Sequence, residues 1–538
     1  MKKAGVSAIE IFKYKMLLLG MINILVLSLM SGILGAGYLG ISFAILIIFI
    51  SFHSLWLSSM VTRYIRGRNA RGQYRSSLKF FRGALLYVLV TGTAFCAVFV
   101  VFSNQLGSFL VRDIHIGICL LPIAVIILIY GLSEVVCGYL QGMNFYMPVK
   151  IFYLVRQVTC FAGSIASMKF LGRYGQKVAN LKHNSAVVSV YSAFGALLGI
   201  LAGGLAGLIL LVVFCLLLRR EFHAMRGRDT ARFQETAFQG FQVMLSLGIM
   251  QGIRHIMFLA PLPLNYILYV RLCVRDGDSA PWIKTGGYLF GEAVPIMAVF
   301  IAIYVMLNHK NYRQLSSHWK NEAYVLFREK VFAMILSVMT LALPVCAVVS
   351  VLAEPILKCL SKEAAKEGVS VLVYTAIWAV LFLFEVMALR IMELWNETLY
   401  LYLTILMSFG VQTVFAVLSF KTFKIGSMGI TLGVLVQAVF FVIMFLIKFV
   451  KRLRLSGNQL KKLIMAVIVA LAGALIILLI YQLAGDKLSA GVAIAVSAIP
   501  GVLLYLAAVT FLRIVSDKEA EQMPGGELFL RLNELLHR

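Results

Sequence analysis

Long apolar runs separated by short polar connections occupy almost the whole chain. Fourteen of them approach or exceed the roughly 20 residues that a membrane-spanning helix needs. They cover residues 16–36, 40–62, 82–103, 116–138, 149–171, 189–218, 240–270, 286–307, 329–352, 369–389, 399–420, 428–450, 462–484 and 489–513. Because lipid offers no hydrogen bonds, each segment must pair its own backbone groups. The pattern therefore predicts an all-α polytopic membrane protein with fourteen transmembrane helices.

Two of these segments, almost half a chain apart, carry small or polar residues at every fourth position and end in basic clusters. The two ladders are Gly195, Gly199, Gly203 before Arg219 and Arg220, and Gly429, Gly433, Gln437 before Lys451, Arg452 and Arg454. Small residues at this spacing line one helix face and let helices approach closely in lipid. Their recurrence predicts a duplicated membrane domain, the usual architecture of transporters.

The repeat divides the predicted helices into two pseudo-symmetric lobes of six helices and an appendage. We expect the first lobe at residues 1–230, the second at 231–455, and two further helices with a cytoplasmic tail at 456–538. In the tail, leucines recur on one face after Pro524. This spacing favours a short helix on the membrane surface, and a solvated, frayed tail is the alternative.

Composition agrees with a membrane protein, because 61% of the 538 residues are hydrophobic and 13% are charged. Soluble proteins have about 45–50% apolar and about 25% charged residues. The net charge of +26 indicates orientation and contact with anionic lipids, not nucleic acid, since Lys and Arg collect in cytoplasmic loops. Both termini are expected in the cytoplasm, with the largest basic cluster in the connection between the second and third helices, at Arg63, Arg66, Arg68, Arg71, Arg75, Lys79 and Arg82.

Motifs of enzymes, metals and cofactors are absent from the sequence. It has no G-x-x-x-x-G-K-[ST], H-E-x-x-H or G-x-S-x-G motif, and its 8 cysteines form no C-x-x-C pair. We therefore expect no enzymatic activity, no metal and no cofactor. Any transport must then be driven by a gradient or by the downhill flow of the substrate.

Ionisable residues inside membrane spans suggest function by default. The densest group lies on the seventh span and consists of Gln251, Arg254 and His255. Pro261 and Pro263 follow and should break the helix. A broken, polar helix at mid-membrane suits a substrate site between repeats. The alternative is an interhelical ion pair between Arg254 and Glu292 of the eighth span.

Five further residues are candidates for substrate binding or coupling. Arg156 on the fifth span is expected to line a cavity, whereas Lys150 at its start binds substrate or anchors the helix at the interface. His53 faces a cavity or is a satisfied core histidine. Glu134 and Glu385 occupy corresponding places in the two halves and are coupling or structural carboxylates. Glu292, named above, is a further possible coupling residue.

Two stretches of the first half carry a family resemblance. They are Arg71-Gly72-Gln73-Tyr74-Arg75 followed by Phe81-Arg82-Gly83-Ala84-Leu85-Leu86, and Gly138-Tyr139-Leu140-Gln141-Gly142 with Met147-Pro148. They resemble the polysaccharide-exporter branch of the multidrug/oligosaccharidyl-lipid/polysaccharide superfamily, and within it the stage V sporulation protein B group, related to the lipid II flippases. The resemblance implies a MATE-like fold with a cationic central cavity. The chain departs from this pattern at two places. Arg156 precedes Gln157 where the group has an acidic residue, and the basic residues of the first helix, Lys13 and Lys15, lie only at its start. The identity of the lipid-linked substrate therefore stays open.

The resemblance implies a flippase for an undecaprenyl-linked saccharide or peptidoglycan precursor in the bacterial cytoplasmic membrane, acting as a monomer. A pyrophosphate head group needs paired cations, which Arg254, Arg156 and His53 could supply. A cation-coupled multidrug exporter is the first alternative, although five of the first six spans contain neither Asp nor Glu. The second is a non-transporting scaffold for cell-wall or spore-coat enzymes. Cell-wall enzymes or glycosyltransferases are the expected protein partners.

Overall fold

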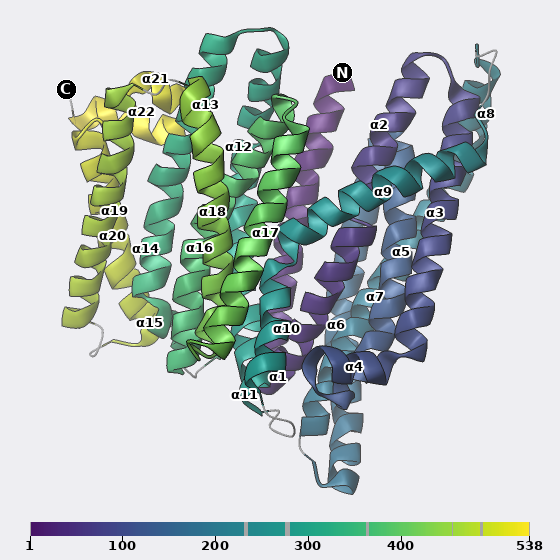
Figure 1. The fold of residues 1–538 in the computed structure, drawn as a ribbon, viewed down its shortest axis with the longest axis horizontal. Coiled ribbons are helices and arrows are strands. Elements are labelled where there is room, and N and C mark those ends of the chain that lie inside the picture. Colours follow the sequence, from purple (N-terminus) through teal and green to yellow (C-terminus); the bar gives the residue numbers. More distant parts are fainter. Residues whose placement is uncertain are drawn as a thin grey trace. The chain divides into compact units, whose positions relative to one another are not determined.

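The computed structural model describes residues 2–184, 186–230, 235–274, 280–361, 365–453, 456–484 and 488–536, and no strand occurs among them. The chain forms two compact units, Met1–Gly291 and Glu292–Arg538 (Figure 1). The lobe boundaries expected from the sequence repeat, after residues 230 and 455, stay predictions. Arg454 of the second basic cluster lies outside the described residues.

The first unit contains eleven of the labelled α-helices. They are α1 (Lys2–His53), α2 (Leu57–Ala70), α3 (Tyr74–Val101), α4 (Ser103–Val111), α5 (Gly117–Gly142), α6 (Tyr146–Lys182), α7 (Ala186–Leu217), α8 (Arg219–Gly227), α9 (Ala237–Leu259), α10 (Pro261–Cys273) and α11 (Ala280–Gly286), with the 3-10 turn η1 (Ile114–Ile116) before α5. The π-helical turn η2 (Gly287–Ala293) leads into the second unit.

The predicted fold class is confirmed, although the number of spans depends on how one long segment is counted. Twelve described helices are long and apolar enough to cross a membrane, or up to thirteen with the bent pair α9–α10. One of the twelve, Ile9–Ala70, has 62 residues. Gly32 (φ 70°, ψ 170°) interrupts it with a backbone conformation that glycine adopts readily. Figure 1 shows α1 running away from the N-terminus and α2 returning, so this one long segment covers the first two predicted spans.

The glycines of the first ladder lie in the contact between α7 and α6. A β-carbon at Gly195 would lie 2.6 Å from the Ser167 carbonyl oxygen, and one at Gly203 would lie 2.7 Å from the Arg156 carbonyl oxygen. The two backbones therefore touch, as the spacing predicts. Because the two backbones touch, this contact fixes the position of Arg156 along the axis of α7.

The second unit contains the remaining helices. They are α12 (Val294–Lys320), α13 (Tyr324–Ser337), α14 (Leu343–Val351), α15 (Ala353–Ser361), α16 (Lys366–Leu394), α17 (Thr398–Lys421), α18 (Met428–Leu453), α19 (Gly457–Ala484), α20 (Ala490–Phe511), α21 (Asp517–Gln522) and α22 (Gly526–Leu536), with the π-helical turn η3 (Val338–Ala342) between α13 and α14. The expected tail helix is present as α22.

The last two spans of the second unit pack on α13 around one apolar core. Phe332 of α13, Tyr505 of α20 and Phe529 of α22 belong to this core. Polar contacts add to it, since Lys462 of α19 is 2.7 Å from Glu519 of α21. Leu535 of α22 remains 74% exposed, so part of the leucine face is not covered by the other described residues.

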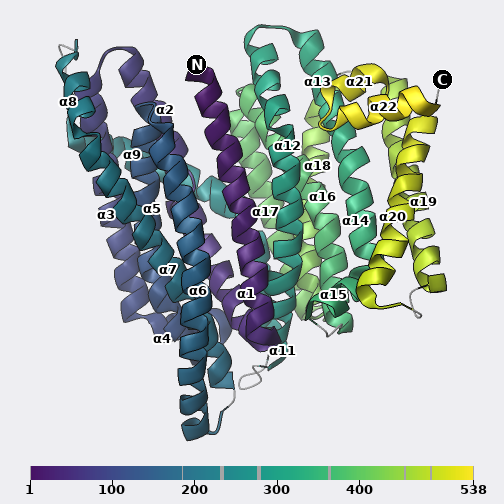
Figure 2. The same ribbon diagram turned by 180° about the vertical axis from the view of Figure 1, so that it is seen from behind.

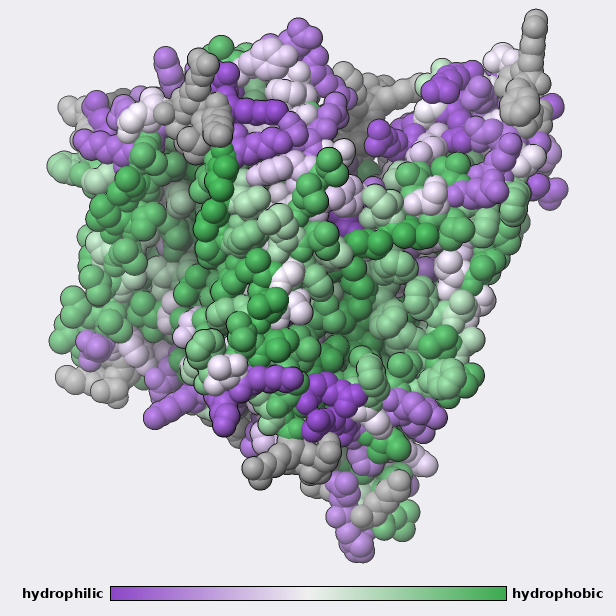
Figure 3. Space-filling view, in the orientation of Figure 1, coloured by the Kyte–Doolittle hydropathy of each residue, from purple (hydrophilic) through white to green (hydrophobic). Residues whose placement is uncertain are grey.

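Polar side chains gather at the ends of each unit and apolar ones along its length (Figure 3). In the first unit, the N-terminus, the α2–α3 turn and α8 lie at one end, and the α6–α7 connection lies at the other (Figures 1 and 2). In the second unit, the α12–α13 turn and the C-terminal helices share one end. In the first unit, the N-terminus therefore shares one end with the α2–α3 turn, which carries the largest basic cluster.

At this end of the second unit, one carboxylate binds two cations. Glu397, between α16 and α17, accepts from Lys448 at 2.6 Å and also from Arg452. The hydrogen bond from Lys448 is the main cause of a lowered Glu397 pKa. This contact ties the end of α18 to the α16–α17 turn.

Candidate functional site

Two ionisable residues that the sequence places in separate spans meet in the first unit. Arg156 Nη1 of α6 lies 3.8 Å from Glu134 Oε1 of α5, and each side chain is 15% exposed. The Tyr153 hydroxyl donates to the Glu134 carboxylate oxygens at 3.1 and 3.2 Å. A buried charge without such partners is strongly destabilising. The pair explains how both charges are tolerated inside spans.

Aromatic rings enclose the guanidinium of Arg156. Its central carbon lies 4.9 Å from the ring centre of Tyr130, 5.2 Å from that of Phe152 and 4.9 Å from that of Tyr153. Cation–π contacts at such distances are stabilising, more so where water is excluded. The Arg156 Nε is buried and has no hydrogen-bond partner in the described part of the chain. The rings therefore fix the group while one of its donors is unused.

The polar contacts continue from Tyr153 into α1 and α2. Lys13 Nζ of α1 lies 5.5 Å from the Tyr153 ring centre and donates to Ser58 Oγ of α2 at 3.2 Å. Gln141 Nε2 of α5 donates to the same Ser58 oxygen at 3.1 Å. Four helices thus contribute to one chain of contacts.

Arg66 completes this set from the end of α2. Its Nη2 donates to the Tyr146 hydroxyl at 3.1 Å and to the Gln141 carbonyl oxygen at 3.4 Å. Its Nε is also buried, and no residue that the structure describes accepts a hydrogen bond from it. We call this set the cation network, and it consists of Lys13, Ser58, Arg66, Glu134, Gln141, Tyr153 and Arg156.

The cation network holds three permanent cations and one carboxylate, so its charge is net positive. Buried N–H groups are normally paired with protein or water. Its two buried guanidinium Nε–H groups have no hydrogen-bond partner among the described residues. Because both atoms are buried, an anion reaches them only if the enclosing side chains move apart, and it would then be held by charge-assisted hydrogen bonds.

Sequence reasoning found only part of this network. It named Arg156 and Glu134 separately, and it assigned Lys13 and Arg66 to the ends of helices. Tyr153 and Ser58 were not identified. The spacing of Tyr153 and Arg156 places both on one face of α6 and was an available signal. The contacts with Lys13 depend on the packing of α1 against α6, which no local pattern shows.

His53 is a core residue in this structure. It is 0% exposed, its Nδ1 lies 2.8 Å from Ser54 Oγ and its Nε2 lies 2.9 Å from Thr91 Oγ1. Its ring also stacks on Tyr87 with centroids 6.2 Å apart. This geometry matches the second of the two sequence interpretations, a satisfied core histidine, and it does not offer the ring to a substrate.

The predicted break in the seventh span is present. Helix α9 ends at Leu259, α10 begins at Pro261, and the two are bent by 65°. Proline cannot donate the helical hydrogen bond and fixes its own φ, so the two prolines account for the bend. A β-carbon at Gly252 would lie 2.8 Å from the Phe52 carbonyl oxygen, which places this face of α9 directly on α1.

The polar group of α9 lies just before this bend. Gln251, Arg254 and His255 are all partly buried, and His255 Nδ1 lies 2.8 Å from the Gln251 carbonyl oxygen. Their assignment to a substrate site stays a prediction. So does the alternative ion pair between Arg254 and Glu292.

The other three candidates occupy different environments. Lys150 is partly buried in the second turn of α6. Glu292 in η2 is 2% exposed and Glu385 in α16 is 1% exposed. The Glu385 Oε1 has no hydrogen-bond partner among the described residues. Glu134 and Glu385 therefore differ, because Glu134 is neutralised by Arg156.

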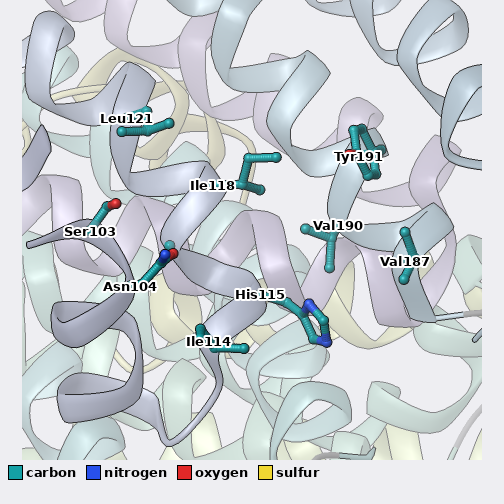
Figure 4. Close-up of a pocket in the computed structure, with 10 residues that line it drawn as sticks. Ser103, Asn104, Ile114, His115, Ile118, Leu121, Val187, Val190 and Tyr191 are labelled. Atoms are coloured by element: carbon teal, nitrogen blue, oxygen red, sulfur yellow. The ribbon is translucent and has the colours of Figure 1, made fainter. Parts of the chain in front are cut away.

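A hollow of about 410 Å³ lies at the opposite end of the first unit from the N-terminus. Figure 4 shows Asn104 of α4, His115 of η1 and Tyr191 of α7 around it. It contains no Lys, Arg, Asp or Glu among its lining residues. Among the described residues no group of three or more His, Cys, Asp and Glu could hold a metal ion.

Comparison with known proteins gives structural likeness without close sequence similarity. No protein-family model and no curated protein matches the chain. The lipid II flippase MurJ in an inward closed conformation matches with a TM-score of 0.63 at 12% identity, over 94% of this chain and 98% of that chain. An inward-facing multidrug resistance MATE transporter of the MOP superfamily matches with a TM-score of 0.61 at 13% identity, over 82% and 96%.

A third solved structure agrees with these two. The eukaryotic MATE transporter AtDTX14 matches with a TM-score of 0.57 at 12% identity, over 84% of this chain and 97% of that chain. All three likenesses extend over nearly the whole of the solved chains. The chain is therefore a multi-pass helical protein with the fold of the MOP-superfamily transporters.

Proposed function

We propose that this protein is a flippase that moves an undecaprenyl-linked saccharide pyrophosphate, or a peptidoglycan precursor, across the bacterial cytoplasmic membrane by alternating access. The observation that carries this proposal is the cation network with its two unused guanidinium donors. A pyrophosphate is recognised by cations and hydrogen-bond donors, and the network contains three cations. They are spread along α6, since Arg66 contacts Tyr146 at the start of that helix and Arg156 lies about 15 Å further along it. The likeness to a lipid II flippase supports the same class of substrate.

The roles within the network follow from its contacts. Arg156 and Arg66 each have a buried Nε–H group with no partner among the described residues, which a conformational change during alternating access would have to uncover for phosphate oxygens. Lys13 adds a compact positive charge. Glu134 holds Arg156 in place through the ion pair and limits the net charge. Arg254, with Gln251 and His255, is proposed to bind the substrate at a second point on the bent α9–α10 helix, and Lys150 is proposed to act at the membrane interface.

A cation-coupled multidrug exporter is the second candidate function, and one observation favours it. Glu385 is buried in α16, and its Oε1 has no hydrogen-bond partner among the residues that the structure describes. Buried carboxylates in spans serve as proton or cation sites in transporters. The two MATE likenesses point the same way. Against it, the carboxylate of Glu134 already binds Arg156 and Tyr153.

Reconstitution of the full chain into proteoliposomes tests the choice between these functions. We expect a labelled polyprenyl-pyrophosphate saccharide to become accessible to a membrane-impermeant reagent, and we expect no ethidium uptake under a proton or sodium gradient. Gradient-driven ethidium movement that Glu385→Gln abolishes would instead identify a drug exporter. If the protein moves neither substrate, the scaffold interpretation is favoured, in which glycosyltransferases or cell-wall enzymes are the partners.

Substitutions at Arg254 test the proposed second contact. If Arg254 binds phosphate, Arg254→Ala should abolish transport without loss of folding, and Arg254→Lys should recover only part, since an ammonium lacks the bidentate fork. If Arg254 instead neutralises Glu292, Arg254→Ala should lower stability by leaving a buried carboxylate unpaired. Full rescue of transport by Arg254→Ala with Glu292→Ala would exclude the phosphate role.

The remaining proposals concern membrane orientation, oligomeric state and family. We propose that both termini are cytoplasmic, that the protein acts as a monomer, and that it belongs near the stage V sporulation protein B group. The charge pattern supports the orientation, because the basic α2–α3 turn lies at the same end of the first unit as the N-terminus.

A further inference from the structure

A cationic hollow of about 460 Å³ lies between α3 and α8, at the end of the first unit that holds the N-terminus. Its lining residues are Arg75, Leu78, Lys79, Arg82, His223, Arg226 and Gly227. Four of the seven carry a permanent positive charge and none is acidic. The nearby Asp229 carboxylate accepts from the backbone N–H of Arg75 at 2.6 Å. The hollow therefore has a strong excess of positive charge.

Local structure explains why these cations face one another. Arg75, Lys79 and Arg82 follow each other at intervals of four and three residues on α3 and so share one helix face. The short helix α8 supplies His223 and Arg226 from the other side. The cations of two separate elements thus converge on one space.

An aromatic cluster fixes α8 in this place. Phe222 of α8 packs on Tyr139 and Phe145 with ring centroids 5.4 and 5.5 Å apart. Phe81 of α3 stacks on the same Tyr139 ring at 4.3 Å. The hollow is consequently built on a rigid apolar base that belongs to the core of the unit.

Exposed apolar surface begins directly beside the hollow. On α3, the residues that follow Arg82 include Leu86 and Val90, which are 42% and 49% exposed. On α7, immediately before α8, Leu216 and Leu217 are 64% and 71% exposed. Figure 3 shows the hydrophilic surface at this end giving way to hydrophobic surface along the helices. The combination of charge and adjoining apolar faces suits an amphiphile with an anionic head.

We propose that this hollow binds the phosphate of an anionic diacyl phospholipid, with the acyl chains lying along the exposed faces of α3 and α7. Basic pockets at the cytoplasmic ends of membrane helices recognise such head groups, and the cytoplasmic leaflet is rich in them. Arginines at 82 and 226 can make charge-assisted hydrogen bonds to phosphate oxygens. The site is formed by residues outside the cation network, so it does not depend on the proposed transport function.

Native mass spectrometry of the full chain in detergent tests this site. Dioleoylphosphatidylglycerol should be retained in preference to dioleoylphosphatidylcholine. Arg82→Gln with Arg226→Gln should weaken retention about thirtyfold, since each surface cation contributes about fivefold. The control, Arg173→Gln with Lys177→Gln, removes the same charge from exposed positions at the far end of α6 and should change nothing.

Three results would overturn the proposal. They are equal retention of the two lipids, equal retention by the wild type and the Arg82→Gln/Arg226→Gln variant, and full displacement of the lipid by an equal concentration of glycerol phosphate. The last would assign the hollow to a free phosphate. Arg82→Lys with Arg226→Lys keeps the charge and should bind within about threefold of wild type. If the double glutamine variant does not fold, Arg82→Gln alone should show the fivefold loss.

Discussion

Replacing Arg156 with alanine is expected to reduce transport of the lipid-linked substrate about a hundredfold. The substitution removes one of three cations in the cation network and the unused Nε–H donor. Charge-assisted hydrogen bonds contribute about 1.5–3 kcal/mol each, and about 2.7 kcal/mol corresponds to roughly a hundredfold. Arg156→Lys should recover only part of the activity, because an ammonium cannot reproduce the planar fork. The measurement is the initial rate of substrate flipping in proteoliposomes.

A loss of folding has to be separated from a loss of binding. Arg156→Ala leaves the Glu134 carboxylate, 15% exposed, without its cation, and removal of one partner of a buried pair typically destabilises by about 3–5 kcal/mol. Arg156→Ala with Glu134→Gln removes both charges and should restore the thermal midpoint but not transport. Recovery of transport in this double variant would show that Arg156 only neutralises Glu134.

A surface ion pair provides the matched control for this experiment. Lys358 and Glu354 of α15 lie 2.7 Å apart and are about half exposed, at 51% and 52%. Exposed pairs contribute about 0–1 kcal/mol. Lys358→Ala should therefore change neither stability nor transport measurably, although it also breaks an ion pair on a helix.

Features of the fold that follow from local chemistry could be predicted from the sequence. The spans follow from apolar length, and the bend between α9 and α10 follows from Pro261 and Pro263. The close approach of α7 to a neighbour follows from the Gly195 ladder. That neighbour, α6, could not be read from the ladder alone, because the spacing specifies a face and not its partner.

The candidate site was less predictable because its chemistry depends on contacts between distant segments. Arg156 was expected to line a cavity, and the structure shows it paired with Glu134. The sequence offered no means to choose between the two environments considered for His53. Lys13 enters the site only because α1 packs beside α6. The sequence alone locates the ionisable residues inside the spans. Their contact partners can be identified only from the three-dimensional structure.

Replacing Gly199 with leucine is expected to prevent the first unit from assembling. A β-carbon at Gly199 would lie 2.0 Å from the Ser164 backbone nitrogen, 2.2 Å from its Cα and 2.4 Å from the Gly163 carbonyl carbon. These are backbone atoms of a packed helix and cannot rotate away, so α6 and α7 would have to separate. Overpacking of this kind destabilises by more than about 3 kcal/mol. Detergent size-exclusion profiles should show aggregation, and no thermal midpoint comparable to wild type should remain.

The same contact connects packing to the proposed transport. A β-carbon at Gly203 would lie 2.7 Å from the Arg156 carbonyl oxygen, so a retreat of α6 from α7 would shift the backbone that carries Arg156. Gly199→Ala, if it folds, should therefore transport more slowly than its stability alone predicts. Gly172→Ala is the control on α6, since nothing lies within 4 Å of a β-carbon there and alanine favours helix by about 1 kcal/mol. A Gly199→Leu protein with the wild-type midpoint would show that the α6–α7 backbone contact is not required.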